Sequence, residues 1–173
     1  SVRFNTYVDE YFRMRHRRGV IRENAIDKVR HKDYFAAMMV HCGDADMMFA
    51  GLLTHYVDTL RIFLEVIGPE PGIKRISSHY LILLPKDVVL LADCVVNIDP
   101  SAEELAEIAL LTARISRALG IEPVVGMLSY SNFGSSDSPE ANLVRRAREI
   151  VKEKDPTLIC DGDVQGILAF NKE

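Results

Sequence analysis

The segment Val124-Val125-Gly126-Met127-Leu128 is an apolar run of strand length, and the polar loop Ser129–Ser136 follows it. Ser138 and Pro139 then supply a helix N-cap and a first helical position. A helix is expected from there to about residue 154, with another apolar strand at Leu158–Cys160. Strands that alternate with helices are typical of α/β layers. The sequence therefore predicts a mainly parallel sheet with helices on both faces.

Residues 1–33 are expected to form a helical N-terminal segment, and the α/β lobe is expected to span residues 34–173. The continuous apolar run Tyr34–Val40 predicts a strand that is covered on both faces. Residues 45–50 predict a short strand or a turn. Residues 54–67 carry large apolar side chains at three- and four-residue spacing, which predicts a helix.

Two further segments, residues 73–84 and 88–96, are β-branched and apolar. The turn Pro85-Lys86-Asp87 separates them, so they predict an antiparallel hairpin. Ser101 and Glu104 have the spacing of a capping box, and a helix is expected to begin there.

Composition excludes several classes of protein. The 173 residues are enough for one domain with a small appendage. With 21 basic and 25 acidic side chains the net charge is −4, which argues against nucleic acid as a partner. No apolar run reaches the roughly 18 residues of a membrane span, and no membrane partner is expected. The scattered Cys42, Cys94 and Cys160 form neither a disulfide framework nor a CxxC pair, which indicates a reducing, cytoplasmic location.

Polar loops mark the places where ligands are expected, because ligands of open α/β sheets bind beyond the carboxyl ends of strands. This rule selects Asn97–Pro100, Ser129–Ser136 and Asp161–Gln165. Hydroxyls and backbone N–H groups ahead of a helix can cradle a phosphate or a carbonyl; an ordinary loop with capping hydroxyls is the alternative. No P-loop lysine is present, so a nucleotide triphosphatase is excluded. The candidate ligand-binding residues of these loops are Asn97, Ser129, Ser131, Asn132, Ser135, Asp161 and Gln165.

Basic side chains provide a second kind of candidate. The cluster near residue 16 consists of Arg13, Arg15, His16, Arg17 and Arg18. It is either a solvated face or a contact for an anion. Arg61 lies near the expected start of a helix, beside His55 and Thr59, and can hold an anionic ligand through its guanidinium. A local ion pair between Asp58 and Arg61 is the alternative.

No metal site or catalytic residue is predicted. The histidines at positions 41, 55 and 79 have no HxxxH or HExxH spacing. Cys94 is expected to be a core thiol, and no GxSxG nucleophile motif is present.

Seven segments taken together resemble the phosphate acetyltransferase family, in the family's order from near residue 7 to near residue 171. They are Tyr34-Phe-Ala-Ala-Met-Met-Val, Gly43-Asp-Ala-Asp46, Asp58-Thr-Leu-Arg61, Ala92-Asp-Cys-Val-Val-Asn97, Ala102-Glu-Glu-Leu-Ala-Glu-Ile-Ala109, Met127-Leu-Ser-Tyr-Ser-Asn-Phe-Gly-Ser135, and Asp161-Gly162 with Gln165. The resemblance implies a three-layer α/β/α sandwich of the isopropylmalate-dehydrogenase-like type.

The resemblance also implies a function. The family transfers an acetyl group between coenzyme A and phosphate. Related domains form the C-terminal half of large bacterial NADP-dependent malic enzymes, where they are regarded as regulatory modules that sense acetyl-CoA. Thr54-His55-Tyr56-Val57 resembles the Thr-His-Tyr-Pro of the malic-enzyme type more than the Ser-Thr-Ala of transacetylases. The expected parent is therefore an NADP-dependent malic enzyme, which converts malate to pyruvate. This segment is expected to bind acetyl-CoA or a related anion and to form a homodimer or a higher homo-oligomer. A catalytic phosphate acetyltransferase and a structural dimerisation lobe without a ligand are the alternatives.

The chain departs from the family pattern in two ways. Ile62 stands where the family usually has proline. The family domain is about twice as long, and its Ser-Arg-Gly segment with catalytic groups is expected beyond residue 173. We therefore expect the isolated chain to be inactive in acetyl transfer. NADP and a divalent metal, Mg²⁺ or Mn²⁺, are implied only for the malic-enzyme half, so the ligand expected here is a small molecule, either acetyl-CoA as effector or phosphate.

Overall fold

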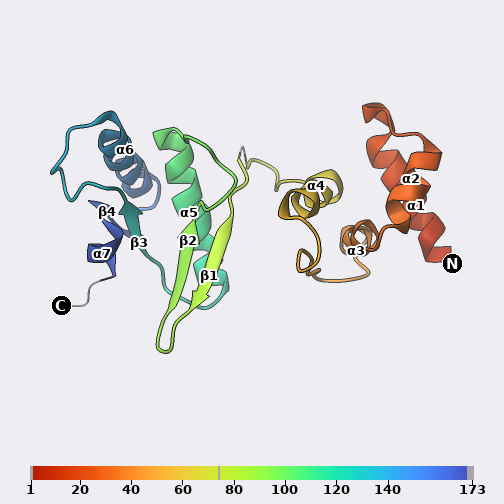
Figure 1. Cartoon of the computed structure of the whole chain (residues 1–173), viewed down its shortest axis with the longest axis horizontal. Coiled ribbons are helices and arrows are strands. Elements are labelled where there is room, and N and C mark those ends of the chain that lie inside the picture. The colour runs from red at the N-terminus through yellow and green to blue at the C-terminus, as the bar shows by residue number, and fades with distance from the viewer. Residues whose placement is uncertain (1, 74, 171–173) are drawn as a thin grey trace. The chain divides into compact units, whose positions relative to one another are not determined.

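The computed structural model describes residues 2–73 and 75–170. The chain divides into two compact units, residues 1–74 and residues 75–173 (Figure 1). The expected helical segment of residues 1–33 is thus part of a larger helical unit.

The unit of residues 1–74 is built from helices. They are α1 (Val2–Arg15), the 3₁₀ helix η1 (His16–Arg18), α2 (Arg22–Arg30), α3 (Lys32–His41) and α4 (Tyr56–Val66). Each of the four α-helices contributes to one core, whose largest fully buried side chains are Tyr7, Tyr11 and Met38. The ring of Tyr7 packs edge-on against Phe35 at 5.0 Å between centroids. The expected helix over residues 54–67 is confirmed as α4.

The strand expected at Tyr34–Val40 is wrong, because these residues lie in helix α3. The buried members of the run are Tyr34, Ala37 and Met38, which follow helical spacing. Ala and Met are also strong helix formers. Because the other residues of the run are apolar as well, the sequence does not show this helical periodicity. Residues 45–50 form no strand either.

The unit of residues 75–173 is an α/β structure. Its elements are β1 (His79–Leu83), β2 (Val88–Ala92), α5 (Ala102–Ala118), β3 (Val124–Leu128), α6 (Pro139–Lys154), β4 (Ile159–Val164) and α7 (Gly166–Ala169). β1 and β2 form the expected antiparallel hairpin, and β3 and β4 form a parallel pair. Among the described residues the strands make two separate two-stranded sheets rather than one continuous sheet.

Both long helices of this unit begin where the sequence predicts. Ser101 caps α5, since its Oγ accepts from the Glu104 N–H at 3.3 Å while Glu104 Oε2 accepts from the Ser101 N–H at 2.9 Å. Ser138 caps α6 by accepting from the Ala141 N–H at 3.2 Å. Helices α5 and α6 pack against each other over β3 and β4. Small side chains allow their close approach, and the buried cluster is Ala106, Ala109, Ala113, Met127, Ala147, Ile150, Val151, Leu158 and Cys160.

Strand β4 runs further than expected. It continues through Val164, so Asp161 and Asp163 are strand residues and only Gln165 follows the strand. Because β3 and β4 are parallel, the segment after Leu128 and the segment after Val164 lie at the same edge of the sheet.

Candidate functional site

The loop after β3 is attached to the end of β4. The Ser129 N–H donates to the carbonyl of Val164 at 2.9 Å. The Gln165 N–H donates to Asn132 Oδ1 at 2.8 Å, and Gln165 Nε2 donates to the carbonyl of Tyr130 at 2.5 Å. The structure therefore brings Ser129, Asn132 and Gln165 together, as the strand-end rule predicts.

Hydroxyl groups of the loop are used within the loop itself. Ser131 Oγ is buried, accepts from the Ser136 N–H at 3.1 Å and lies 3.2 Å from Ser135 Oγ. Ser135 Oγ accepts from the Asn132 N–H at 2.9 Å, and Ser129 Oγ accepts from the Ser131 N–H at 3.2 Å. In this conformation the serines hold the loop in shape.

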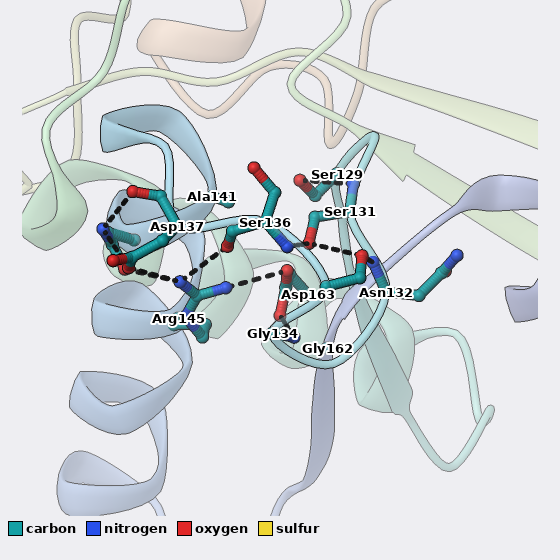
Figure 2. A network of polar contacts seen from close by, with 12 residues as sticks. Ser129, Ser131, Asn132, Gly134, Ser136, Asp137, Ala141, Arg145, Gly162 and Asp163 are labelled. Carbon is teal, nitrogen blue, oxygen red and sulfur yellow. Dashed lines mark hydrogen bonds and ion pairs between the residues drawn. The ribbon is translucent and has the colours of Figure 1, made fainter.

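An ion pair between β4 and α6 lies under the loop (Figure 2). Asp163 has no exposed side-chain surface, and its Oδ2 accepts from Arg145 Nη1 at 3.1 Å. Its Oδ1 accepts from the Gly134 N–H at 3.2 Å. Arg145 Nη2 also donates to the carbonyl of Ser136 at 3.0 Å. The ion pair thus connects strand, helix and loop.

Asp163 is held as a carboxylate. A side-chain hydrogen bond from Ser131 is the largest influence on it, and the Gly134 N–H and the charge of Arg145 act in the same direction. Together they lower the pKa of Asp163 although its desolvation acts in the opposite direction. An ionised, fully paired carboxylate has no proton to give and no free oxygen for a ligand. Its role is to position the loop.

Two predicted residues lie apart from this network. Asn97 belongs to the turn after β2, where its N–H donates to Asp93 Oδ2 at 2.6 Å and its Nδ2 donates to the carbonyl of Ile76 at 2.9 Å. Asp161 is exposed, and its Oδ1 lies 3.5 Å from Arg148 Nη1. Arg145 was not predicted as a site residue, because nothing in the sequence distinguishes it from Arg146 and Arg148 on the same helix.

A separate cavity in the unit of residues 1–74 gathers three arginines. It has a volume of about 310 Å³. Arg15 and Arg18 come from the end of α1 and from η1, while Arg61 comes from the second turn of α4. The remaining lining residues are Val57, Leu60, Leu64 and Glu65. The cavity therefore combines apolar residues with three arginines in its lining.

Glu65 lines the same cavity as the arginines, but its hydrogen bonds are made with other residues. Its Oε2 accepts from Lys28 Nζ at 2.8 Å and from the hydroxyls of Tyr34 at 2.7 Å and Tyr11 at 2.9 Å. Burial pushes the pKa of Glu65 upward, but the three hydrogen bonds outweigh it and lower the pKa. Glu65 therefore stays ionised and is paired with Lys28.

The arginines are correspondingly weakly paired. Arg15 Nε is buried and has no hydrogen-bond partner in the part of the chain that the structure describes. Arg61 Nη1 lies 3.4 Å from Asp58 Oδ1, an exposed local pair of the kind that contributes at most about 1 kcal/mol. Arg61 thus forms the local pair with Asp58 and also lines the basic cavity.

His55 and Thr59 stand next to this cavity in sequence but do not line it. His55 is the N-cap residue of α4, and its carbonyl accepts from the Thr59 N–H at 3.1 Å. The side chain of Thr59 is buried, and its Oγ1 has no hydrogen-bond partner among the residues that the structure describes. Of the three residues predicted in this segment, Arg61 alone lines the cavity.

The described part of the chain holds neither a metal cluster nor a membrane-spanning helix. Over the described ranges no three His, Cys, Asp or Glu side chains are grouped so that they could hold a metal ion. No helix in those ranges is long and apolar enough to cross a membrane.

The unit of residues 75–173 is an α/β domain with a polar loop at the carboxyl end of its parallel strands. Comparison with known proteins identifies the family. Residues 1–173 match the family described as Phosphate acetyl/butaryl transferase, and the chain belongs to it. It is similar to the phosphotransacetylase of Streptococcus pyogenes, with a TM-score of 0.84 and 36% identity over 98% of this chain and 52% of that one. The EutD phosphotransacetylase of Staphylococcus aureus gives a TM-score of 0.81 and 29% identity, covering 93% of this chain and 50% of that one. The expected α/β fold of phosphotransacetylase type is thereby confirmed.

Sequence relatives come from two kinds of enzyme. The chain is 41% identical to the NADP-dependent malic enzyme of Escherichia coli (strain K12) over 97% of its length and 22% of that protein. It is 39% identical to the phosphate acetyltransferase of Nitratidesulfovibrio vulgaris over 95% of its length and 23% of that protein. The chain thus spans about a quarter of these relatives and about half of the phosphotransacetylases of known structure.

Proposed function

We propose that this chain is an acetyl-CoA-binding part of a phosphotransacetylase-type domain and that the cavity lined by Arg15, Arg18 and Arg61 holds a phosphate group of that ligand. The presence of three arginines in the lining of one cavity carries the proposal. A guanidinium binds phosphate through two parallel hydrogen bonds. An apolar wall next to the charges suits a nucleotide, which joins phosphates to a flat apolar base.

The size of the cavity is consistent with a partial contact. Ligand sites for small molecules occupy roughly 300–1,000 Å³, and this cavity of about 310 Å³ lies at the lower limit. It has room for a phosphate and part of a nucleoside, and the rest of coenzyme A would lie outside it.

Within this proposal we favour a parent protein of the NADP-dependent malic-enzyme type, with the segment as a regulatory module that also forms a homodimer. The sequence Thr54-His55-Tyr56-Val57 ahead of Arg61 supports the regulatory type. NADP and a divalent metal would then be bound outside residues 1–173. A catalytic phosphate acetyltransferase is the second candidate, supported by the 39% identity with the enzyme of Nitratidesulfovibrio vulgaris and by the phosphotransacetylase fold.

Calorimetric titration of acetyl-CoA into residues 1–173 tests the binding. Arg61→Lys should lose a charge-assisted bond of about 1.5–3 kcal/mol, which is roughly tenfold or more in affinity. Arg17→Ala is the matched control, since Arg17 belongs to the same basic cluster but does not line the cavity. Equal affinities of the two variants, or no binding by the wild type at millimolar ligand, would contradict the proposal. The parent protein's activity is decided separately, by assaying the full-length protein for NADP reduction with malate and for acetyl phosphate formation.

A further inference from the structure

An ion pair joins two neighbouring cavities in the unit of residues 1–74. Lys28 donates from Nζ to Glu65 Oε2 at 2.8 Å. Glu65 lines the cavity of Arg15, Arg18 and Arg61, here called the arginine cavity. Lys28 lines a second cavity of about 510 Å³, and Arg18 lines both. The pair therefore stands at the border of the arginine cavity, although Lys28 is not part of its lining.

The carboxylate of Glu65 on α4 is held by one donor from each of the other three α-helices. Its Oε2 accepts from Tyr11 of α1, from Lys28 of α2 and from Tyr34 of α3. Lys28 also donates to the Tyr34 hydroxyl at 2.7 Å, and its Nζ lies 4.7 Å from the centre of the Tyr34 ring. Both tyrosines are buried, and their rings pack edge-on at 5.8 Å between centroids. The core of the unit thus determines where the carboxylate lies.

Of the three donors, Lys28 alone carries a charge. Burial and the neighbouring Glu65 raise the pKa of both Tyr11 and Tyr34, so their hydroxyls are neutral at neutral pH. Burial also acts to raise the pKa of Glu65, and the hydrogen bond from Lys28 is the largest of the influences that lower it overall. A partly buried carboxylate needs a compensating charge. Lys28 supplies it from the side that faces away from the arginine cavity's lining.

The arginines lie within electrostatic reach of this network. Burial and Glu65 raise the pKa of Tyr34, while the charges of Arg61 and Arg15 act to lower it. The Tyr34 hydroxyl is only 2.7 Å from Glu65 Oε2. Arg15 Nε is buried and has no hydrogen-bond partner among the residues that the structure describes. A carboxylate released from Lys28 would therefore find guanidinium donors in the lining of the same cavity.

We propose that Lys28 is a positioning residue of the arginine cavity, because it keeps Glu65 on the two tyrosine hydroxyls and offsets its charge. Three arginines and one glutamate give the lining a formal charge of +2, and Lys28 neutralises the one negative member. Without Lys28 the carboxylate would compete with a bound anion, since carboxylate and phosphate accept the same paired hydrogen bonds from a guanidinium. The inference rests on the proposed function, in which the arginine cavity binds a phosphate group.

A double-variant cycle tests the inference by calorimetric titration of acetyl-CoA into residues 1–173. Lys28→Met removes the charge at similar side-chain length and should weaken binding roughly tenfold. Glu65→Gln should bind at least as tightly as the wild type, because the competing carboxylate is gone. In the Glu65→Gln background, adding Lys28→Met should change the affinity by less than about threefold, because Lys28 acts through Glu65.

Lys32→Met is the matched control for the loss of one positive charge. Lys32 is exposed and lines neither cavity, so this variant should bind within about twofold of the wild type. Circular dichroism shows whether each variant is folded. If Lys28→Met is unfolded, the double variant decides, since it leaves no carboxylate without its cation. Equal affinities of the double variant and Glu65→Gln, with Glu65→Gln at least as tight as the wild type, then support the inference.

Three results would overturn the inference. Equal affinities of the wild type and Lys28→Met would show that Lys28 has no influence on the cavity, while the proposed function would stand. The same weakening by Lys28→Met with and without Glu65→Gln would mean that Lys28 contacts the anion directly from the second cavity. No binding by the wild type at millimolar acetyl-CoA would contradict the proposed function and this inference with it.

Discussion

Replacing Asp163 by alanine should destabilise the unit of residues 75–173 strongly. The side chain is fully buried and accepts hydrogen bonds from Arg145, Gly134 and Ser131. Removing one partner of a buried ion pair costs about 3–5 kcal/mol. Arg145 keeps 21% of its side-chain surface exposed, so water can solvate it in part. The lower end of the range, about 3 kcal/mol, is therefore expected.

Asp161→Ala is the matched control. Asp161 lies two residues earlier on β4 and also pairs with an arginine of α6, but 67% of its side chain is exposed and the separation is 3.5 Å. Its loss should change the free energy of unfolding by at most about 0.5 kcal/mol.

Urea unfolding followed by far-ultraviolet circular dichroism measures both variants, since the chain has no tryptophan for fluorescence. With a denaturant slope of about 2 kcal/mol per M, Asp163→Ala should lower the midpoint by about 1.5 M. Amide exchange in β4 assigns the change to the unit of residues 75–173. A shift below about 0.5 M, or equal shifts for both variants, would refute the assignment of Asp163 as the anchor of the loop.

The same pair predicts a pH dependence. The folded-state pKa of Asp163 is lowered relative to the unfolded value of about 3.9. The stabilisation by the carboxylate is therefore complete above about pH 4 and is lost as the pH falls through the folded-state pKa. The difference in stability between the wild type and Asp163→Ala should be constant at neutral pH and should shrink below pH 4.

Three other substitutions have defined outcomes. Glu65→Gln removes the charge to which two buried tyrosines and the partly exposed Lys28 donate and should lower the stability of the unit of residues 1–74 by about 2 kcal/mol, seen as a lower urea midpoint. Gly162→Ala would place a Cβ 2.4 Å from the Met127 carbonyl at a φ of +127°, so its thermal midpoint should fall by several degrees; an unchanged midpoint would show that the strands can separate freely. Ser101→Ala removes the N-cap of α5 and should cost about 1 kcal/mol, with faster amide exchange confined to the first turn.

Local signals predicted most of the fold. The hairpin depends on two neighbouring segments joined by a short turn, and the Ser101 capping box and the Ser138-Pro139 helix start depend on residues within four positions of one another; the structure confirms all three. The run Tyr34–Val40 was assigned wrongly because periodicity carries no information where polar residues are absent. The gap between β2 and β3 could not be predicted, since strand order depends on contacts between distant segments.

The candidate sites were predicted less completely. The Ser129–Ser136 loop and Gln165 were found because the end of a strand is a local feature. The pairing of Arg145 with Asp163 was missed because it joins residues 18 positions apart through the packing of α6 on β4. The cavity around Arg61 was missed as a unit for the same reason, although Arg15 and Arg18 had been noted as part of a basic cluster.

The charges of the chain are unevenly distributed, and this affects how an anion approaches it. Residues 1–74 carry 11 basic and 10 acidic side chains, whereas residues 75–173 carry 10 and 15. The unit that contains the cavity is therefore close to neutral, with 11 − 10 = +1, and the acidic excess belongs to the other unit. The Debye length falls from about 30 Å at an ionic strength of 0.01 M to about 8 Å at physiological ionic strength, so added salt shortens the range over which the arginines attract an anion. Rising salt should therefore slow the encounter of an anion with the cavity.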